Sequence, residues 1–243
     1  MPAVALFVTC VVDQVAPEVG IGAVRLLEAA GCTVVFPDAQ TCCGQPACNA
    51  GEPEAAARLA THFLDVFEPY DTIVAPSGSC VAMVHHWYER LLTGRDAERA
   101  RELAQRTHEL AGYLVDELET VDLGANLDTT VTVHDACHGL RYLWVKDAPR
   151  QLLAAAGATL VELTESETCC GFGGTFSLEH GEIATPLADD KLGHAAATGA
   201  RWLVSGDTAC LLHLEGRRRR TGVGPEPVHF AQLLSAGLPA SRG

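Results

Sequence analysis

The chain has 243 residues, of which 48% are hydrophobic and 20% charged, and its formal net charge is −14. This length suits one large domain or two small ones with a buried core. The acidic balance makes nucleic acid a poor partner, and no apolar run approaches the roughly 18 residues of a membrane span. The N-terminus lacks the basic segment of a secretory signal, so we expect a cytoplasmic protein.

Short β-rich segments alternate with helix-like segments along the chain. Each half has three segments with strand character that lead to a cysteine: AVALFVTC, GCTVVFPDAQTCCG and DTIVAPSGSC, then TVTVHDAC, GATLVELTESETCCG and RWLVSGDTAC. The segments between them predict helices over residues 17–30, 53–67, 81–92, 97–119, 140–156, 178–198 and 209–218. Strands alternating with helices predict an α/β fold with mostly parallel sheets whose faces are covered.

The two halves of the sequence repeat each other. An offset of 127 residues relates Cys10, Cys42, Cys43 and Gly44 to Cys137, Cys169, Cys170 and Gly171, and an offset of 130 relates Cys80 to Cys210. We therefore expect an internal duplication that gives two similar Rossmann-like lobes, over residues 1–120 and 130–243. The polar segment DLGANLDTT is the predicted linker.

Cysteine is the residue type that carries the chemical signal. In a reducing compartment, the ten cysteines of the chain favour metal binding or redox chemistry over structural disulfides. Sites in parallel α/β sheets form beyond the carboxyl ends of the strands, where the repeated cysteines lie. We therefore expect one set of four thiols at the strand ends of each lobe: Cys10, Cys42, Cys43 and Cys80, and Cys137, Cys169, Cys170 and Cys210.

Four converging thiolates suit either zinc or an iron–sulfur cluster. Structural zinc sites usually take cysteines two to four residues apart, whereas the side chains of adjacent cysteines diverge and more readily reach different irons of one extended cluster. The glycine after each pair, Gly44 or Gly171, lets the backbone approach the cofactor and can offer an N–H to a sulfur.

The pattern Cys–x31–Cys-Cys–x36–Cys, with its second copy Cys–x31–Cys-Cys–x39–Cys, resembles the duplicated CCG cysteine-rich domain. That domain occurs in heterodisulfide reductases and in the iron–sulfur subunit of glycerol-3-phosphate dehydrogenase. The phrases FPDAQTCCGQPA, APSGSCVAM, HDACHGLR and CCGFGGTFS look most like the lactate-utilisation protein A branch. The resemblance covers nearly the whole chain.

This resemblance implies an iron–sulfur electron-transfer subunit of a multi-subunit system that oxidises L-lactate to pyruvate. One or two clusters of the [4Fe-4S] type would be held by the eight cysteines, and Gly44 and Gly171 would shape the cofactor loops. The chain would be part of an L-lactate dehydrogenase-type oxidoreductase and inactive alone, because it shows no base paired with a hydride acceptor. Its partners would be the other subunits, and any membrane association would be peripheral, through a partner.

One departure from the fullest family pattern concerns the last motif, which there is Cys-x-x-Cys. Here its first positions are Ser77 and Asp207, so each lobe keeps four cysteines. This departure favours an ordinary four-thiolate cluster, or oxygen ligation from Asp207, over a five-thiolate non-cubane cluster.

Two other interpretations of the cysteines stay open. A zinc-stabilised, non-catalytic scaffold subunit would use the same thiols, and a thiol–disulfide reductase of the heterodisulfide reductase type would use them for exchange. Outside the repeat, Cys32 suits a buried small hydrophobe, and Cys48 suits an accessory ligand or redox thiol. His134 and His138 flank Cys137, and each could donate to a cluster sulfur or a substrate carboxylate, or be a hydrogen-bonded core histidine.

Overall fold

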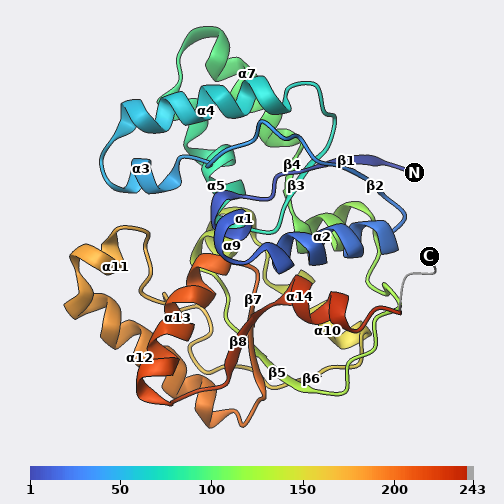
Figure 1. Ribbon diagram of the computed structural model, residues 1–243, viewed down its shortest axis with the longest axis vertical. Coiled ribbons are helices and arrows are strands. Elements are labelled where there is room, and N and C mark those ends of the chain that lie inside the picture. The colour runs from blue at the N-terminus through green and yellow to red at the C-terminus, as the bar shows by residue number, and fades with distance from the viewer. Residues whose placement is uncertain (240–243) are drawn as a thin grey trace.

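The computed structural model describes residues 1–239 and contains two four-stranded sheets in which every strand pair is parallel (Figure 1). The first sheet has the order β2-β1-β3-β4 and the second the order β6-β5-β7-β8. The strands are β1 Ala3–Leu6, β2 Thr33–Val35, β3 Ile73–Ala75, β4 Thr107–Glu109, β5 Thr130–Val133, β6 Thr159–Leu160, β7 Trp202–Ser205 and β8 Glu226–His229. The predicted α/β fold with a repeated Rossmann-like arrangement is confirmed.

Helices connect the strands and cover both sheets. In the first half they are α1 Cys10–Val15, α2 Pro17–Ala29, α3 Gln45–Asn49, α4 Pro53–Phe67, α5 Gly78–His86, α6 Tyr88–Leu91, α7 Gly94–Gln105, α8 Leu110–Gly112 and the π-helical turn η1 Tyr113–Glu117. In the second half they are α9 Cys137–Leu143, α10 Asp147–Ala155, α11 Phe176–Glu179, α12 Gly181–Ala197, α13 Thr208–Thr221 and α14 Phe230–Ala236. None of the helices within residues 1–239 is both long and apolar enough to cross a bilayer.

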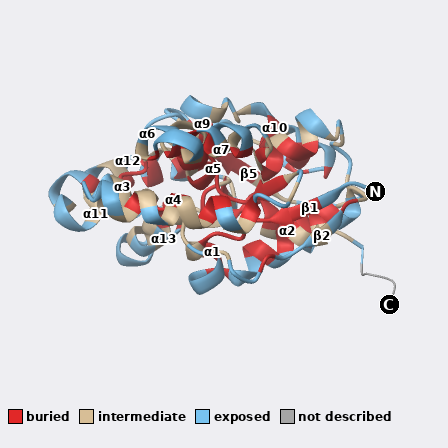
Figure 2. Cartoon of the chain, turned by 90° about the horizontal axis from the view of Figure 1, so that it is seen from above, coloured by how far each residue is buried: buried red, intermediate tan, exposed pale blue. Residues whose placement is uncertain are grey.

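Strand β1 divides its side chains between two layers, because successive residues of a strand point to opposite faces. Val4 and Leu6 join the core that lies between the two sheets, whereas Ala5 and Phe7 join a separate core under α4. The Phe7 ring lies 5.0 Å from that of Phe63 of α4. Buried residues accordingly follow the strands and the helices next to them (Figure 2).

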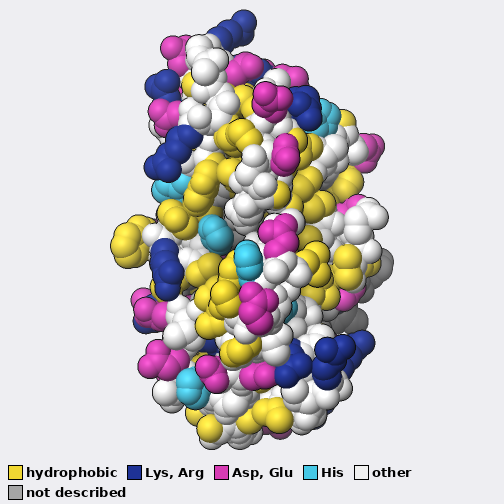
Figure 3. All heavy atoms as spheres, turned by 90° about the vertical axis from the view of Figure 1, so that its left-hand side faces the viewer, with side chains coloured by type: hydrophobic (Ala, Val, Ile, Leu, Met, Phe, Trp, Pro, Cys, Tyr) yellow, Lys and Arg dark blue, Asp and Glu magenta, His cyan; other side chains and the backbone are white. Residues whose placement is uncertain are grey.

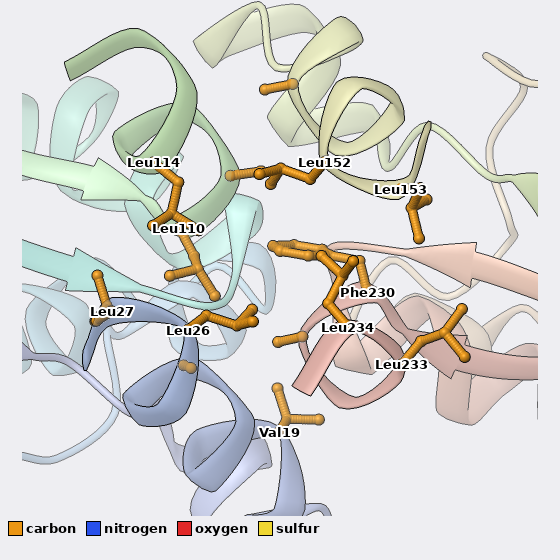
Figure 4. Close-up of a cluster of buried hydrophobic side chains, with 14 of the residues drawn as sticks. Val19, Leu26, Leu27, Leu110, Leu114, Leu152, Leu153, Phe230, Leu233 and Leu234 are labelled. Carbon is orange, nitrogen blue, oxygen red and sulfur yellow. The ribbon is translucent and has the colours of Figure 1, made fainter. Parts of the chain in front are cut away.

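The core between the sheets joins the two lobes. Leu26 of α2, Leu110 of α8, Leu152 of α10 and Leu234 of α14 are all at most 1% exposed and meet there (Figure 4). Helix α2 of the first lobe packs along α14 of the second, and α10 of the second packs on α8 and η1 of the first. Because each lobe covers the other's sheet, the relative position of the two sets of strand ends is fixed.

Several predicted helices are shorter or more divided than the sequence pattern suggested. The helix predicted over 97–119 is interrupted after residue 105, because Thr107–Glu109 forms β4 and pairs with β3 before helical turns resume in α8 and η1. The helix predicted over 140–156 is interrupted at Trp144, whose φ of 59° is left-handed. Those predicted over 81–92 and 178–198 are also interrupted, at Trp87 and His180. Strand β8 and helix α14 had no predicted counterpart.

Candidate metal centres

The four repeated cysteines of the first lobe lie together at the carboxyl ends of its strands. Cys10 begins α1, Cys42 and Cys43 follow β2, and Cys80 lies in the first turn of α5. The sulfurs of Cys43 and Cys80 are 3.3 Å apart. The Cys42 sulfur interacts with the neighbouring side chains of Cys10 and Cys43, and both interactions lower its pKa. The four sulfurs therefore form one continuous set.

The second lobe repeats this arrangement. Cys137 begins α9, Cys169 and Cys170 follow β6, and Cys210 lies in the first turn of α13. Cys169 interacts with the side chains of Cys137 and Cys170, and Cys170 also interacts with Cys210. All eight cysteines are free thiols, so each lobe offers one donor set.

The first cysteine of each adjacent pair is the member of its set whose thiol has a lowered pKa. Hydrogen bonds from two thiols lower the pKa of Cys42 to about 3 and that of Cys169 to about 2. The same bonds and burial raise the pKa of the donors Cys10 and Cys137 far above the usual range. A soft metal that displaces the remaining protons would therefore meet one thiolate already formed in each lobe.

Gly44 and Gly171 shape the two loops around the thiolates. Both have left-handed backbone conformations, with φ of 86° and 90°, which a residue with a Cβ rarely adopts. The Gly44 N–H donates to Cys42 Sγ at 3.4 Å, and the Gly171 N–H donates to Cys169 Sγ at 3.3 Å. These N–H groups stabilise negative charge on the sulfurs.

Ser77 and Asp207, which replace cysteines of the fuller motif, cap the helices that carry the last cysteines. Ser77 Oγ accepts from the Cys80 N–H, and Asp207 accepts from the Ala209 N–H at 3.2 Å. The second Asp207 oxygen accepts from the Ser79 N–H of the other lobe at 3.0 Å. Both Asp207 oxygens thus bind backbone N–H groups, and the two capping loops join across the lobe interface through a Ser77–Asp207 bridge.

Sequence reasoning missed the residues that hold the first thiol set in place. The Gln40 amide spans from β1 to the cysteine loop, since Oε1 accepts from Val8 N at 2.8 Å and Nε2 donates to Leu6 O at 3.1 Å. The buried hydroxyl of Tyr88 donates to the Cys43 carbonyl at 2.9 Å. A glutamine two residues before a cysteine pair was the only sequence signal for this role.

The second thiol set has charged and polar surroundings instead. Lys191 of α12 is 1% exposed, and its ammonium group donates to Ser166 O at 3.1 Å and to Glu165 O. Burial lowers the pKa of Lys191, while the neighbouring Cys170 and Asp135 favour its charged form. Asp135 is itself held by a bidentate pair with Arg150, at 2.7 and 3.0 Å. The loop before Cys169 is thus fixed by a buried cation.

The other predicted candidates take less central positions. His138 Nδ1 lies 3.5 Å from Cys137 Sγ, and burial lowers the pKa of His138. His134 is buried at the end of β5, with its backbone N–H bonded to Val204 O. Cys32 is buried in the core between the sheets, and Cys48 lies at the edge of the core under α4.

Seven of the eight thiols line two adjoining cavities between the lobes, and Cys42 lines a separate pocket. A cavity of about 310 Å³ is lined by Cys10, Cys43 and Cys80, and an adjoining one of about 60 Å³ by Cys137, Cys169, Cys170 and Cys210 of the second lobe. Gln45, Asn49, Ser79, Phe172, Gly174 and Ala209 line both. Figure 3 shows the molecule from the side of α3 and α11, where hydrophobic side chains and histidines gather across the middle of the face.

The donor chemistry of each set fits a thiophilic metal or an iron–sulfur cluster. The spacing of the sulfurs places one condition on that fit. Two thiolates bound to one tetrahedral zinc at about 2.3 Å stand about 3.8 Å apart, whereas Cys43 and Cys80 are separated by 3.3 Å. The sulfurs must therefore move slightly apart around one zinc ion, and farther apart around a cluster in which each thiolate binds a different iron.

The repeated fold and the paired cysteine sets define the class of protein. The model of a family described as "Cysteine-rich domain", abbreviated CCG, matches residues 4–85 and again residues 131–215. Full-length relatives narrow the class further. The chain is 42% identical to Lactate utilization protein A of Bacillus cytotoxicus over 96% of its own length and 98% of the relative's, and 42% identical to that of Macrococcus caseolyticus over 98% of both. The chain belongs to the lactate utilization protein A family.

Two solved structures are distant matches to the chain. A putative Asp/Glu racemase from Yersinia pestis aligns over 98% of this chain and 97% of its own, with 13% identity and a TM-score of 0.39. The glutamate racemase isoform RacE1 from Bacillus anthracis aligns over 97% of this chain and 79% of its own, with 12% identity and a TM-score of 0.40.

Proposed function

We propose that this chain is an iron–sulfur electron-transfer subunit of a cytoplasmic, multi-subunit system that oxidises L-lactate to pyruvate. The observation that carries the proposal is the convergence of four cysteines in each lobe, with three thiols of the first set and all four of the second lining two adjoining cavities. Membership of the lactate utilization protein A family supports lactate as the substrate of the system.

In this proposal each lobe holds one cluster through its four cysteines, and Gly44 and Gly171 stabilise the cluster sulfurs with their N–H groups. A bound cluster accepts and releases single electrons. The residues of the chain hold the thiolates, exclude water from the buried sulfurs and keep the two sites at adjoining cavities. Cys43 and Cys170 are each 2% exposed, so little solvent reaches the inner sulfurs.

Oxidation of lactate removes two electrons and two protons, and the proposal assigns that step to a partner subunit. Within residues 1–239, the residues lining the two cavities provide thiols, amides, hydroxyls, one histidine and the hydrogen-bonded Asp207 carboxylate. This set suits electron transfer better than hydride abstraction. The chain therefore works with the other subunits of the system.

Anaerobic purification followed by iron, sulfide and visible-absorbance measurements tests the proposal. We expect iron and sulfide in the wild type, and about half of each in the Cys42→Ser and Cys169→Ser variants, because each removes the central thiolate of one lobe. Cys32→Ser and Cys48→Ser are the matched controls and should retain full iron. A wild type without iron and sulfide, or unchanged iron in both ligand variants, would refute the proposal.

Zinc-stabilised scaffolding is the second candidate, and the compactness of the sites favours it. The donor atoms of His134, Cys170 and Cys210 all lie within 4.8 Å of one another, a spacing that one tetrahedral ion can span. A colourless protein that contains stoichiometric zinc and no sulfide, and unfolds when a chelator removes the metal, would favour this candidate over the first.

A further inference from the structure

The imidazole of His134 is a buried polar group without a conventional partner. His134 follows β5, and the residue is only 1% exposed. Neither ring nitrogen makes a hydrogen bond of normal geometry within the described chain, although the backbone of Ser166 lies close enough to favour a proton on the ring. A buried polar group left unsatisfied costs about 1–3 kcal/mol, so this position needs a physical reason.

The direction of the ring supplies that reason. Side chains alternate along β5, so His134 lies on the opposite face from Val133, which belongs to the core between the sheets. A ring nitrogen of His134 and the sulfurs of Cys170 and Cys210 lie within 4.8 Å of one another, and all three residues are buried. The unsatisfied imidazole is therefore directed at the thiol set of its own lobe.

The first lobe shows what a purely structural residue looks like at this position. The offset of 127 residues relates His134 to Phe7, whose ring is fully buried among Phe63 and Phe67 in the same core as Cys43 and Cys80. Packing alone is thus satisfied by an apolar ring. A histidine in its place adds a nitrogen donor and nothing that packing requires.

We propose that His134 is a nitrogen ligand of the metal group in the second lobe, so that this lobe binds with four thiolates and one imidazole while the first lobe binds with thiolates alone. The inference rests on the proposed metal binding of the second lobe. Metal-bound histidines usually direct their other ring nitrogen at a backbone carbonyl or carboxylate. The Ser166 backbone and Asp135 lie near His134 and would take this role.

A buried charge gives the second centre a different electronic character from the first. The imidazole adds a neutral donor to four thiolates, so the ligand charge of the second centre equals that of the first. The buried Lys191 ammonium stabilises a more negative, reduced centre. We therefore expect the second centre to be reduced first.

Pulsed electron paramagnetic resonance of the reduced, anaerobically purified full chain tests this ligand directly. We expect a hyperfine coupling to nitrogen that changes when histidine alone is labelled with ¹⁵N. The coupling should disappear in His134→Phe, which installs the residue of the first lobe, while the four thiols keep the iron bound.

His138→Gln is the matched control, because His138 is the other histidine near these thiols, 3.5 Å from Cys137 Sγ. The coupling should survive in His138→Gln. Loss of the coupling in His138→Gln, its persistence in His134→Phe, or its absence from the iron-loaded wild type would overturn the inference and leave His134 as a core residue satisfied by water. If His134→Phe does not fold, the labelled wild type and His138→Gln still decide the question. Absence of iron would refute the proposed function as well, so the two failures are distinguishable by metal content.

Discussion

The two lobes present the same sulfur arrangement in different surroundings. Both place a cysteine whose pKa is lowered by two neighbouring thiols next to a left-handed glycine. Around the first set, the buried neighbours are rings and aliphatic side chains such as Phe7, Phe63 and Leu64. Around the second, His134 and Lys191 take part. The duplication thus preserved the donors and the loops while the groups that set the local electric field diverged.

This difference shows which features the sulfur arrangement itself requires. The repeated strand ends, the glycine and the helix that carries the last cysteine appear in both lobes, so they are needed to gather the thiols. His134 and Lys191 appear in the second lobe only, so the gathering of the thiols does not require them. We interpret them as groups that give two similar sites different properties.

The largest difference in stability between the lobes is expected when each loop glycine, Gly44 or Gly171, is replaced by alanine. In Gly171→Ala the new Cβ would lie 2.4 Å from the Ala184 carbonyl oxygen, whereas in Gly44→Ala the nearest atoms lie at 3.3 Å. Both substitutions carry left-handed strain of about 1–2 kcal/mol, and Gly171→Ala adds an overpacking cost of about 1–3 kcal/mol. Denaturant unfolding of the two variants in the same metal state should show the larger loss for Gly171→Ala. Equal losses would mean that α12 moves freely away from the loop.

Stability should depend on pH in opposite ways at the two residues that cap the helices after β4 and β8. Glu109 caps α8, and His229 caps α14. Burial raises the pKa of Glu109 to about 7 and lowers that of His229 to about 4. Because the pKa of Glu109 is raised in the fold, its contribution to stability is complete below about pH 4.5 and is lost as the pH rises to 7. Because the pKa of His229 is lowered in the fold, the protein loses stability as the pH falls from 6.5 to 4.

The Glu109→Gln variant isolates the first of these contributions, because its amide oxygen can still accept from Ala111 N and Gly112 N. Relative to wild type, its free energy of unfolding should increase as the pH rises from 4.5 to 7, by up to about 3 kcal/mol. Urea unfolding at a series of pH values measures this difference. Parallel pH profiles for the two proteins would show that Glu109 ionises in the fold as it does in the unfolded chain.

Tyr88→Phe should weaken only the first lobe. The Tyr88 hydroxyl donates to the buried Cys43 carbonyl at 2.9 Å, and its loss should cost about 1–2 kcal/mol because a buried acceptor is left unpaired. Chemical denaturation measures the loss, and Tyr142→Phe, on a side chain whose hydroxyl makes no hydrogen bond among residues 1–239, is the control. A cost for Tyr88→Phe no larger than for Tyr142→Phe would contradict the role of this bond.

The smallest effect, with the opposite sign, is expected at a helix glycine of the second lobe. A Cβ at Gly216 of α13 meets nothing within 4 Å, whereas one at Gly22 of α2 would lie 2.7 Å from the Ala231 carbonyl oxygen of α14. Gly216→Ala should stabilise the protein by about 0.5–1 kcal/mol through the helix propensity of alanine, and Gly22→Ala should destabilise it. Thermal melting of both variants checks the pair, and a destabilising Gly216→Ala would contradict the open space around that helix face.

The sequence by itself determined the α/β fold, the repeat and the position of each thiol set relative to its strand. These features are local: strand-like runs end at cysteines, and the offset of 127 residues makes the two halves comparable without coordinates. The sequence could not fix the breaks within its long helical patterns. The sequence pattern around Thr107–Glu109 favours a helix. In the fold this segment forms a strand instead, because it pairs with β3 through backbone hydrogen bonds that a helix could not make.

Only the tertiary structure decided how the two lobes relate and what surrounds each thiol set. The packing of α2 on α14, and the capping of an α5 N–H by Asp207, join residues more than 100 positions apart, and no short-range pattern encodes such contacts. Lys191 was likewise an ordinary polar residue in the sequence, and His134 was one of two histidines flanking Cys137 whose role the sequence left open. The role of each residue follows from its burial beside the sulfurs, because the energy of a polar group depends on the neighbours that folding brings to it.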